Sequence, residues 1–169
     1  KRNIMMICDT HSDTLCAMGV EKNASPVITP ARLRQGGVTL QTFALWSGRQ
    51  GNKGDVKGIM EAEMSMVPTM LAAGMKQVDD PTEAKEGESS FMLSIEGAEI
   101  FEGGLHTVAE WREKGVRMVA LLWNNENKLG QSAKSGSAQG LTDYGVQVVK
   151  EMQRLHMAVD TSHLNEAGF

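Results

Sequence analysis

The sequence has no long apolar segment and no excess of positive charge. Its N-terminal apolar run, Ile4–Cys8, is far shorter than the roughly 18 residues of a membrane span or the about 7–15 of a signal-peptide core. Lys and Arg number 17 against 21 Asp and Glu, which gives a net charge of −4. We therefore expect no membrane segment in this chain and no nucleic-acid-binding surface.

Cysteines and aromatic residues are also scarce. Cys8 and Cys16 have no Cys-x-x-Cys spacing, so we interpret both as small buried hydrophobic residues in a reducing, cytoplasmic compartment. The chain starts with Lys1 rather than Met, so an upstream signal segment is compatible with it. There are 12 Met beside three Trp, one Tyr and four Phe, which favours a core of aliphatic and thioether side chains. We expect one domain over residues 1–169.

Short apolar runs alternate with helix-like stretches, which predicts an α/β fold with a parallel sheet. The first run is continuous and apolar, as in a strand that is buried on both faces. The expected strands are Ile4–Cys8, Val38–Trp46, Phe91–Ile95, Val116–Trp123 and Met157–Val159.

Capping residues and helical periodicity mark the helices between these strands. The expected helices cover residues 30–35 after Thr29, 55–75 with a break at Pro68, 105–114 before Gly115, and a C-terminal helix capped by Thr142. Residues 124–140 are rich in Asn, Ser and Gly and too long for a simple connection, so we expect a functional loop there.

Polar residues follow three of the expected strands, and in parallel β/α folds the site lies at the carboxyl ends of strands. His11 and Asp13 are two residues apart, so both can face one divalent cation from an extended segment. Glu96 ends the third strand, and a carboxylate can bridge two metal ions about 3.5–4 Å apart. His163 follows the fifth strand. We predict that these four residues bind metal.

Each of these residues alone also fits an ordinary role, and only their coincidence at three strand ends favours a metal site. His11 and His163 could each be a capping or surface histidine, and Glu96 could be a turn carboxylate. His106 and His156 do not follow strands, so we expect both to be structural or solvated.

Four blocks occur along the chain in an informative order: Asp9-Thr10-His11-Ser12-Asp13-Thr14-Leu15, Ser94-Ile95-Glu96-Gly97, Gly140-Leu141-Thr142 with the helix after it, and Val159-Asp160-Thr161-Ser162-His163. Together they resemble consecutive motifs of the membrane (renal) dipeptidase family in the amidohydrolase superfamily. The resemblance spans essentially the whole chain.

The resemblance implies a (β/α)8 TIM-type barrel with two zinc ions that hydrolyses dipeptides, in some members those with a D-residue at the C-terminal position. It implies that His11 and Asp13 bind the first zinc, that Glu96 bridges the ions at the catalytic centre, and that His163 binds the second. A metal-bridging hydroxide would attack the scissile carbonyl. Trp123 stands where mammalian members carry a substrate-contacting His, so it is our candidate substrate-binding residue.

The chain is shorter than a complete barrel of about 250 residues, so we expect only the first five β/α units of one. A further metal-binding His and a proton-accepting Asp of the family have no counterpart after His163. We therefore expect a homo-oligomer or a completing chain, and inactivity of these 169 residues alone. Alternatives are a non-catalytic scaffold with a partial metal site that self-associates, or another amide or lactam hydrolase. Such ligands also accept Mn, Fe or Co.

Overall fold

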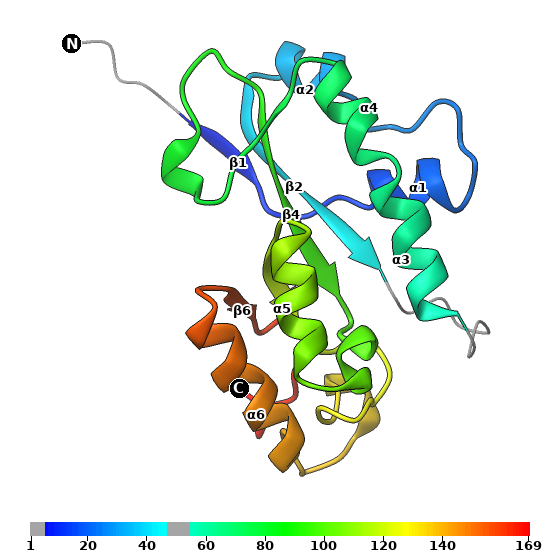
Figure 1. Cartoon of the computed structure of the whole chain (residues 1–169), viewed down its shortest axis with the longest axis vertical. Helices are drawn as coiled ribbons and strands as arrows, with labels where there is room; N and C mark the ends of the chain where they lie inside the picture. Colours follow the sequence, from blue (N-terminus) through cyan, green and yellow to red (C-terminus); the bar gives the residue numbers. More distant parts are fainter. Residues whose placement is uncertain (1–5, 47–54) are drawn as a thin grey trace. The chain divides into compact units, whose positions relative to one another are not determined.

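The structure is a computed structural model that describes residues 6–46 and 55–169 (Figure 1). Two compact units make up the chain: unit 1 comprises Lys1–Leu45 and Ile59–Leu93, and unit 2 comprises Trp46–Gly58 and Ser94–Phe169. Strand β4 (Ser90–Glu96) begins in unit 1 and ends in unit 2.

The strands of unit 1 run parallel. β1 (Ile7–Asp9) pairs with β2 (Val38–Trp46), and β2 has the start of β4 on its other side. The short β3 (Lys76–Gln77) pairs with the first residues of β4. Parallel pairing requires a crossover after each strand, and the helices of unit 1 supply these connections.

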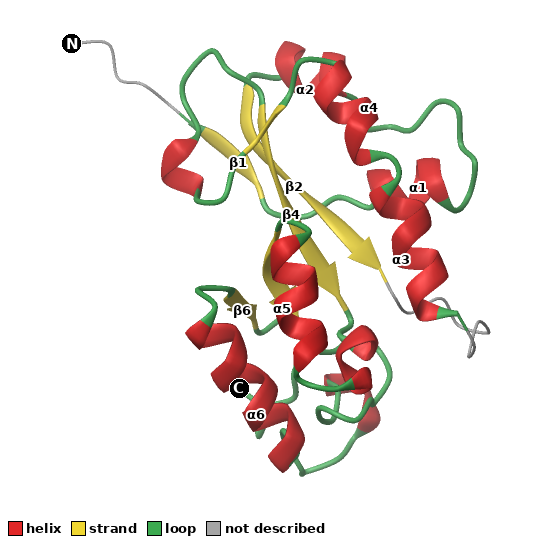
Figure 2. Ribbon diagram, viewed as in Figure 1, coloured by secondary structure: helices red, strands yellow, loops and turns green. Residues whose placement is uncertain are grey.

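The α-helices of unit 1 lie along one side of its strands in Figure 2, and the short helix η1 (Pro81–Glu83) lies on the opposite side in this view. The α-helices are α1 (Thr14–Gly19), α2 (Pro30–Gln35), α3 (Val56–Met64) and α4 (Val67–Ala72). The predicted start of α2 is confirmed, because the Thr29 side chain accepts a hydrogen bond from the Arg32 N–H at 3.3 Å. The predicted break at Pro68 is also confirmed, since this residue lies in the first turn of α4.

Methionine and a few aromatic rings fill the core of unit 1, as the composition predicted. Met60 and Met70 are at most 1% exposed, and Phe43 on β2 contacts Phe91 on β4 with ring centroids 5.6 Å apart. Burial of the Cys16 thiol beside Glu63 agrees with the interpretation of this cysteine as a core residue.

Unit 2 continues the parallel β/α pattern. The end of β4 is followed by β5 (Val116–Ala120) and β6 (Ala158–Asp160). β5 is hydrogen-bonded to β4 and pairs in parallel with β6. The helical elements are η2 (Glu99–Gly103), α5 (His106–Glu113), η3 (Ala133–Ser135) and α6 (Asp143–Arg154). The α/β class with parallel strands is therefore confirmed.

Two arginines join the helices of unit 2 to β5 at the amino end of that strand. Arg112 at the end of α5 donates through Nε to the Leu155 carbonyl after α6, at 3.0 Å. Arg117 donates to the Arg112 carbonyl at 2.7 Å and to the Val116 carbonyl at 2.9 Å. These bonds fix where α5 and α6 end relative to β5.

Several expectations about the strands are wrong. β5 ends at Ala120 rather than Trp123, because an apolar run does not distinguish a strand from the buried loop that follows it. β1 is not buried on both faces: Ile7 is 41% exposed and Cys8 is exposed, since β1 has β2 as its one strand neighbour within the described residues. Residues 4 and 5 of the expected first strand lie outside the described residues.

Elements α1 and β3 were not predicted, because they are too short for their periodicity to emerge from the sequence. Among residues 6–46 and 55–169, no helix combines the length and the apolar character needed to cross a bilayer.

Candidate metal centre

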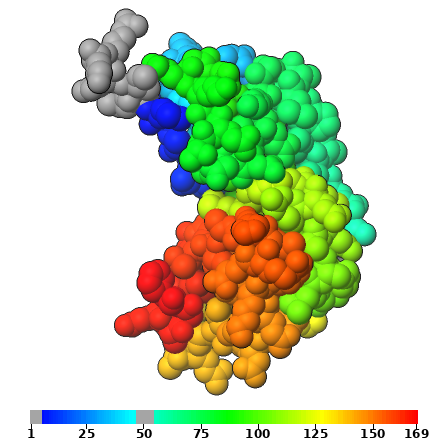
Figure 3. Space-filling view, turned by 60° about the vertical axis from the view of Figure 1, so that its left-hand side comes forward, coloured from blue at the N-terminus to red at the C-terminus, as the bar shows by residue number. Residues whose placement is uncertain are grey.

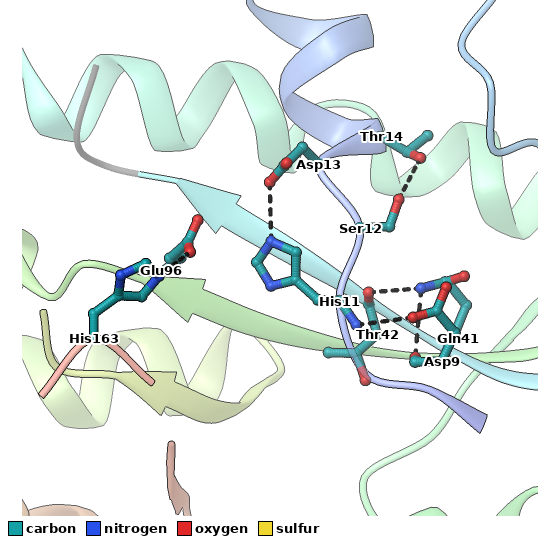
Figure 4. Close-up of polar contacts among 9 residues, drawn as sticks. All are labelled: Asp9, His11, Ser12, Asp13, Thr14, Gln41, Thr42, Glu96 and His163. Atoms are coloured by element: carbon teal, nitrogen blue, oxygen red, sulfur yellow. Dashed lines mark hydrogen bonds and ion pairs between the residues drawn. The ribbon is translucent and has the colours of Figure 1, made fainter. Parts of the chain in front are cut away.

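In unit 1, the residues after β1 place an imidazole beside a carboxylate. His11 Nε2 lies 3.3 Å from Asp13 Oδ1, and Figure 4 shows the two side chains facing each other. Asp13 is the N-cap residue of α1, but its side chain makes no capping hydrogen bond. Its carboxylate is therefore directed to His11 rather than to the helix, as the two-residue spacing predicted.

Backbone contacts hold this segment in place. The His11 N–H donates to Asp9 Oδ1 at 3.2 Å, and the Ser12 carbonyl accepts the Ala44 N–H of β2 at 2.9 Å. Both side chains of the pair remain accessible, with 43% of His11 and 62% of Asp13 exposed. A solvated pair of this kind can take up a cation without large rearrangement.

Sequence reasoning missed Gln41, a fully buried amide in the middle of β2. Its Nε2 donates to the carbonyls of Asp9 at 3.4 Å and Thr42 at 3.0 Å, so it fastens β2 to the residue that precedes the His11 segment (Figure 4). The one signal in the sequence is a polar amide within an otherwise apolar strand, which is costly unless the amide is hydrogen-bonded.

In unit 2, Glu96 and His163 form a second imidazole–carboxylate pair. His163 Nε2 lies 3.0 Å from Glu96 Oε1 although the residues are 67 positions apart (Figure 4). The Glu96 side chain is 15% exposed and that of His163 31%. The strand ends directly after Glu96, where Gly97 has φ +84 and donates its N–H to the Ala120 carbonyl at 3.0 Å.

The separations in both pairs suit ligands that share one ion. Nitrogen and oxygen ligands about 2.0–2.2 Å from a tetrahedral zinc ion lie about 3.4 Å apart. The observed values of 3.3 Å for His11 with Asp13 and 3.0 Å for His163 with Glu96 are close to it. An imidazole and a carboxylate are also ligand types that zinc accepts, so the residues of each pair fit the metal.

Trp123 follows β5 and belongs to unit 2, where its indole packs against that of Trp46. The ring centroids are 4.9 Å apart at an interplanar angle of 72°, an edge-to-face arrangement. Both indoles are half-buried. Trp46 is the last residue of β2, and its pairing with Trp123 was not predicted.

The two remaining histidines lie away from these pairs, as predicted. His106 is the exposed first residue of α5 and lies 3.9 Å from Glu110, while His156 is exposed after α6. Neither histidine follows a strand.

Comparison with known proteins finds relatives of this chain in sequence and in fold. Dipeptidase 3 of Mus musculus is 25% identical over 145 residues, which are 80% of this chain and 29% of the mouse protein. A solved dipeptidase of the M19 metallopeptidases aligns with a TM-score of 0.80 and 22% identity, over 97% of this chain and 58% of the other. A metallopeptidase from Rhodobacter sphaeroides, solved with a phosphinate mimic of the dipeptide L-Ala-D-Ala, aligns with a TM-score of 0.80 and 20% identity.

The Rhodobacter alignment covers 98% of this chain and 61% of that protein. The chain therefore spans less than two thirds of the proteins that it matches. The shared fold confirms the assignment to the (β/α)8 barrel class, of which this chain contains a part. The model of the membrane dipeptidase family matches residues 2–169. The chain belongs to the membrane dipeptidase family, Peptidase family M19.

Proposed function

We propose that His11, Asp13, Glu96 and His163 together hold two zinc ions, with Glu96 bridging them, and that a protein carrying this chain hydrolyses dipeptides. The observation that carries the proposal is the pair of imidazole–carboxylate contacts, at 3.3 and 3.0 Å, on residues that follow β1 and β6 or end β4. Family membership supports a peptide substrate.

Glu96 has the central role in this proposal because a carboxylate carries two oxygen atoms. Oε1 lies beside His163, so one oxygen can share an ion with that imidazole while the other serves the second ion. Its low exposure keeps the carboxylate in one orientation. Two bound zinc ions would supply Lewis acidity, which acidifies water and polarises a carbonyl.

Trp123 is the proposed substrate-contacting residue. A half-buried indole after β5 offers a flat apolar face to a side chain of the substrate. Since the Rhodobacter relative was solved with a mimic of L-Ala-D-Ala, this dipeptide is the first substrate to assay. A small D-residue at the C-terminal position would fit beside a rigid aromatic wall.

The test compares Glu96→Gln with Glu113→Gln, an exposed glutamate in α5, in the natural full-length protein. We expect wild type and Glu113→Gln to retain two zinc ions per chain after dialysis and to hydrolyse L-Ala-D-Ala. Glu96→Gln should lose at least one ion and the activity, because an amide bridges cations poorly. Two retained ions with normal hydrolysis would show that Glu96 does not bridge.

His163→Ala separates the two ions. It should remove one zinc ion and leave the other with His11 and Asp13. Loss of both ions, or of neither, would contradict the assignment of His163 to the second ion.

The 169 residues alone should hydrolyse L-Ala-D-Ala at least about 10²-fold more slowly than the full-length protein, since general acid–base catalysis is worth about 10²–10⁴-fold. The resemblance to the family implies a further His and an Asp in addition to the four proposed ligands. Equal rates would contradict this expectation, and metal binding without activity in the full-length protein would favour the scaffold alternative.

A further inference from the structure

The backbone of His163 has an unfavourable conformation that the surrounding loop must maintain. Its φ is +67, in the left-handed region that residues with a side chain rarely adopt. Such a residue persists only where its surroundings fix it. The direction of the imidazole toward Glu96 therefore depends on contacts made by its own main chain.

The loop before α6 provides these contacts. The Ala133 N–H donates to the His163 carbonyl at 2.8 Å, and Ser132 forms an antiparallel bridge with Leu164. Ser132 in turn donates its hydroxyl to the Asn124 carbonyl at 2.8 Å. The start of the loop is therefore attached both to the residue after Trp123 and to His163.

Asn165 closes the other end of this loop onto the same segment. Its Nδ2 donates to the Ser137 carbonyl at 2.9 Å and to the Gln139 carbonyl at 2.6 Å, while its Oδ1 accepts the Gly168 N–H at 2.9 Å. A side-chain amide offers both of these donors and the acceptor, and a carboxylate has no donor at all. The side chain is thus matched to all three backbone groups.

A close backbone approach supports the same attachment independently. A Cβ added to Gly140 would lie 2.3 Å from the Ala167 carbonyl oxygen, so the end of the loop packs against the residues after Asn165 with no room for a side chain. Figure 3 shows the C-terminal segment, in red, lying against the orange part of the chain that contains the loop end and α6.

We propose that Asn165 is a positioning residue for His163, which it serves by holding loop 132–140 on the segment that carries this histidine. The inference rests on the proposed function for the statement that His163 binds metal. Asn165 touches no reacting atom, because its partners are three backbone groups. It acts through the loop, whose Ala133 N–H restrains the His163 carbonyl.

The test compares Asn165→Asp with Asn23→Asp in the natural full-length protein. At Asn165 the carboxylate loses both donors and faces two carbonyl oxygens. At Asn23 the side-chain oxygen accepts the Ser25 N–H at 2.9 Å, and an aspartate retains that bond. The two variants therefore make the same chemical change, and only the first disturbs the loop.

Three quantities are measured: hydrogen exchange at the Ala133 amide, the NMR signals of the His163 imidazole, and zinc affinity. Asn165→Asp should speed Ala133 exchange at least about tenfold, as expected for the loss of one or two hydrogen bonds. It should also shift the His163 signals and weaken zinc binding, whereas Asn23→Asp should leave all three unchanged.

A lower thermal midpoint with unchanged Ala133 exchange and unchanged His163 signals would show that Asn165 is merely structural, and would overturn the proposal. If Asn165→Asp does not fold, Gly140→Ala is used instead, because its added Cβ would push loop 132–140 away from Ala167. Ala133 exchange and the His163 signals then test the proposal in the same way. If wild type binds no zinc, the proposed function fails, and Ala133 exchange with the His163 signals still decides whether Asn165 positions this histidine.

Discussion

The indole of Trp123 meets that of Trp46 edge to face, with ring centroids 4.9 Å apart. One residue ends β2 and the other follows β5, so the contact joins two strand ends within unit 2. Edge-to-face pairs are worth about 0.5–1.5 kcal/mol beyond the area that they bury. The proposed substrate-contacting residue is thus held by a second aromatic side chain.

This contact should be visible in circular dichroism, because two indoles this close couple their electronic transitions. We expect an exciton couplet in the far-ultraviolet spectrum that disappears in both Trp46→Phe and Trp123→Phe. Trp111→Phe is the control, since Trp111 contacts Lys114 and lies in α5. A couplet that survives either of the first two changes would contradict the observed pairing.

Trp123→His in the full-length protein should change the ratio of rates among dipeptides, because an imidazole replaces the apolar face offered to the substrate. Loss of the edge-to-face contact with Trp46 should also lower the stability by about 0.5–1.5 kcal/mol. A Trp123 that served only packing would instead lose about 1–3 kcal/mol of stability with unchanged selectivity. Parallel kinetic and thermal measurements on one preparation distinguish these results.

Thr142 should contribute measurably to the stability of α6. Its Oγ1 accepts the Gly145 N–H at 3.0 Å and donates to the Lys128 carbonyl at 2.7 Å. Thr142→Ala removes both bonds and should lower the free energy of unfolding by about 0.5–2 kcal/mol in urea titrations. Thr142→Ser retains the hydroxyl and should lose much less; equal losses in both variants would argue against the cap.

The two cysteines should differ sharply in reactivity. Burial, reinforced by Glu63, raises the pKa of the Cys16 thiol from 9.0 to about 12, whereas Cys8 is exposed. A thiol reagent at pH 8 should modify one cysteine quickly in the folded protein and both in denaturant. Cys8→Ser should abolish the fast reaction; a fast reaction that persists would show that Cys16 is accessible.

The same pKa shift fixes the direction of a pH effect on stability. The folded state keeps the Cys16 thiol neutral. Its contribution to the free energy of unfolding is therefore fully present below about pH 9 and is lost as the pH rises toward 12. Cys16→Ala should flatten the fall of the unfolding free energy over that alkaline range. An unchanged alkaline slope would contradict the raised pKa.

Local signals in the sequence predicted the parts of the fold that depend on neighbouring residues. Helix α6 was predicted because its N-cap residue Thr142 and the helical spacing of its apolar residues are both visible within a short stretch of sequence. The orientation of His11 and Asp13 toward the same side was predicted for the same reason, since two residues of backbone determine it. The end of β5 was not, because Leu121 and Leu122 stay buried after the strand has ended.

Contacts between distant residues were predictable only through the topology of parallel strands. The rule that strand carboxyl ends carry the site predicted ligands at Glu96 and His163. No such rule exists for Gln41 or Asn165. The Gln41 amide donates to the neighbouring Thr42 carbonyl and to a carbonyl 32 positions away in the sequence. The Asn165 amide donates to two carbonyls that are 26 and 28 positions away. Every residue has the same backbone carbonyl group, so the sequence does not indicate which carbonyl a side-chain amide will bind.

In unit 2, the residues that stabilise the scaffold and the proposed metal ligands lie at opposite ends of the strands. Arg112 and Arg117 join α5, β5 and α6 at one end of the strands, whereas Glu96 ends β4 and His163 follows β6 at the other end. Substitutions at the half-buried Trp123 would therefore test new specificities without touching these arginine contacts. Stabilising substitutions around Arg112 would lie at the opposite end of the strands from the proposed metal ligands, which makes the two ends separate targets for directed evolution.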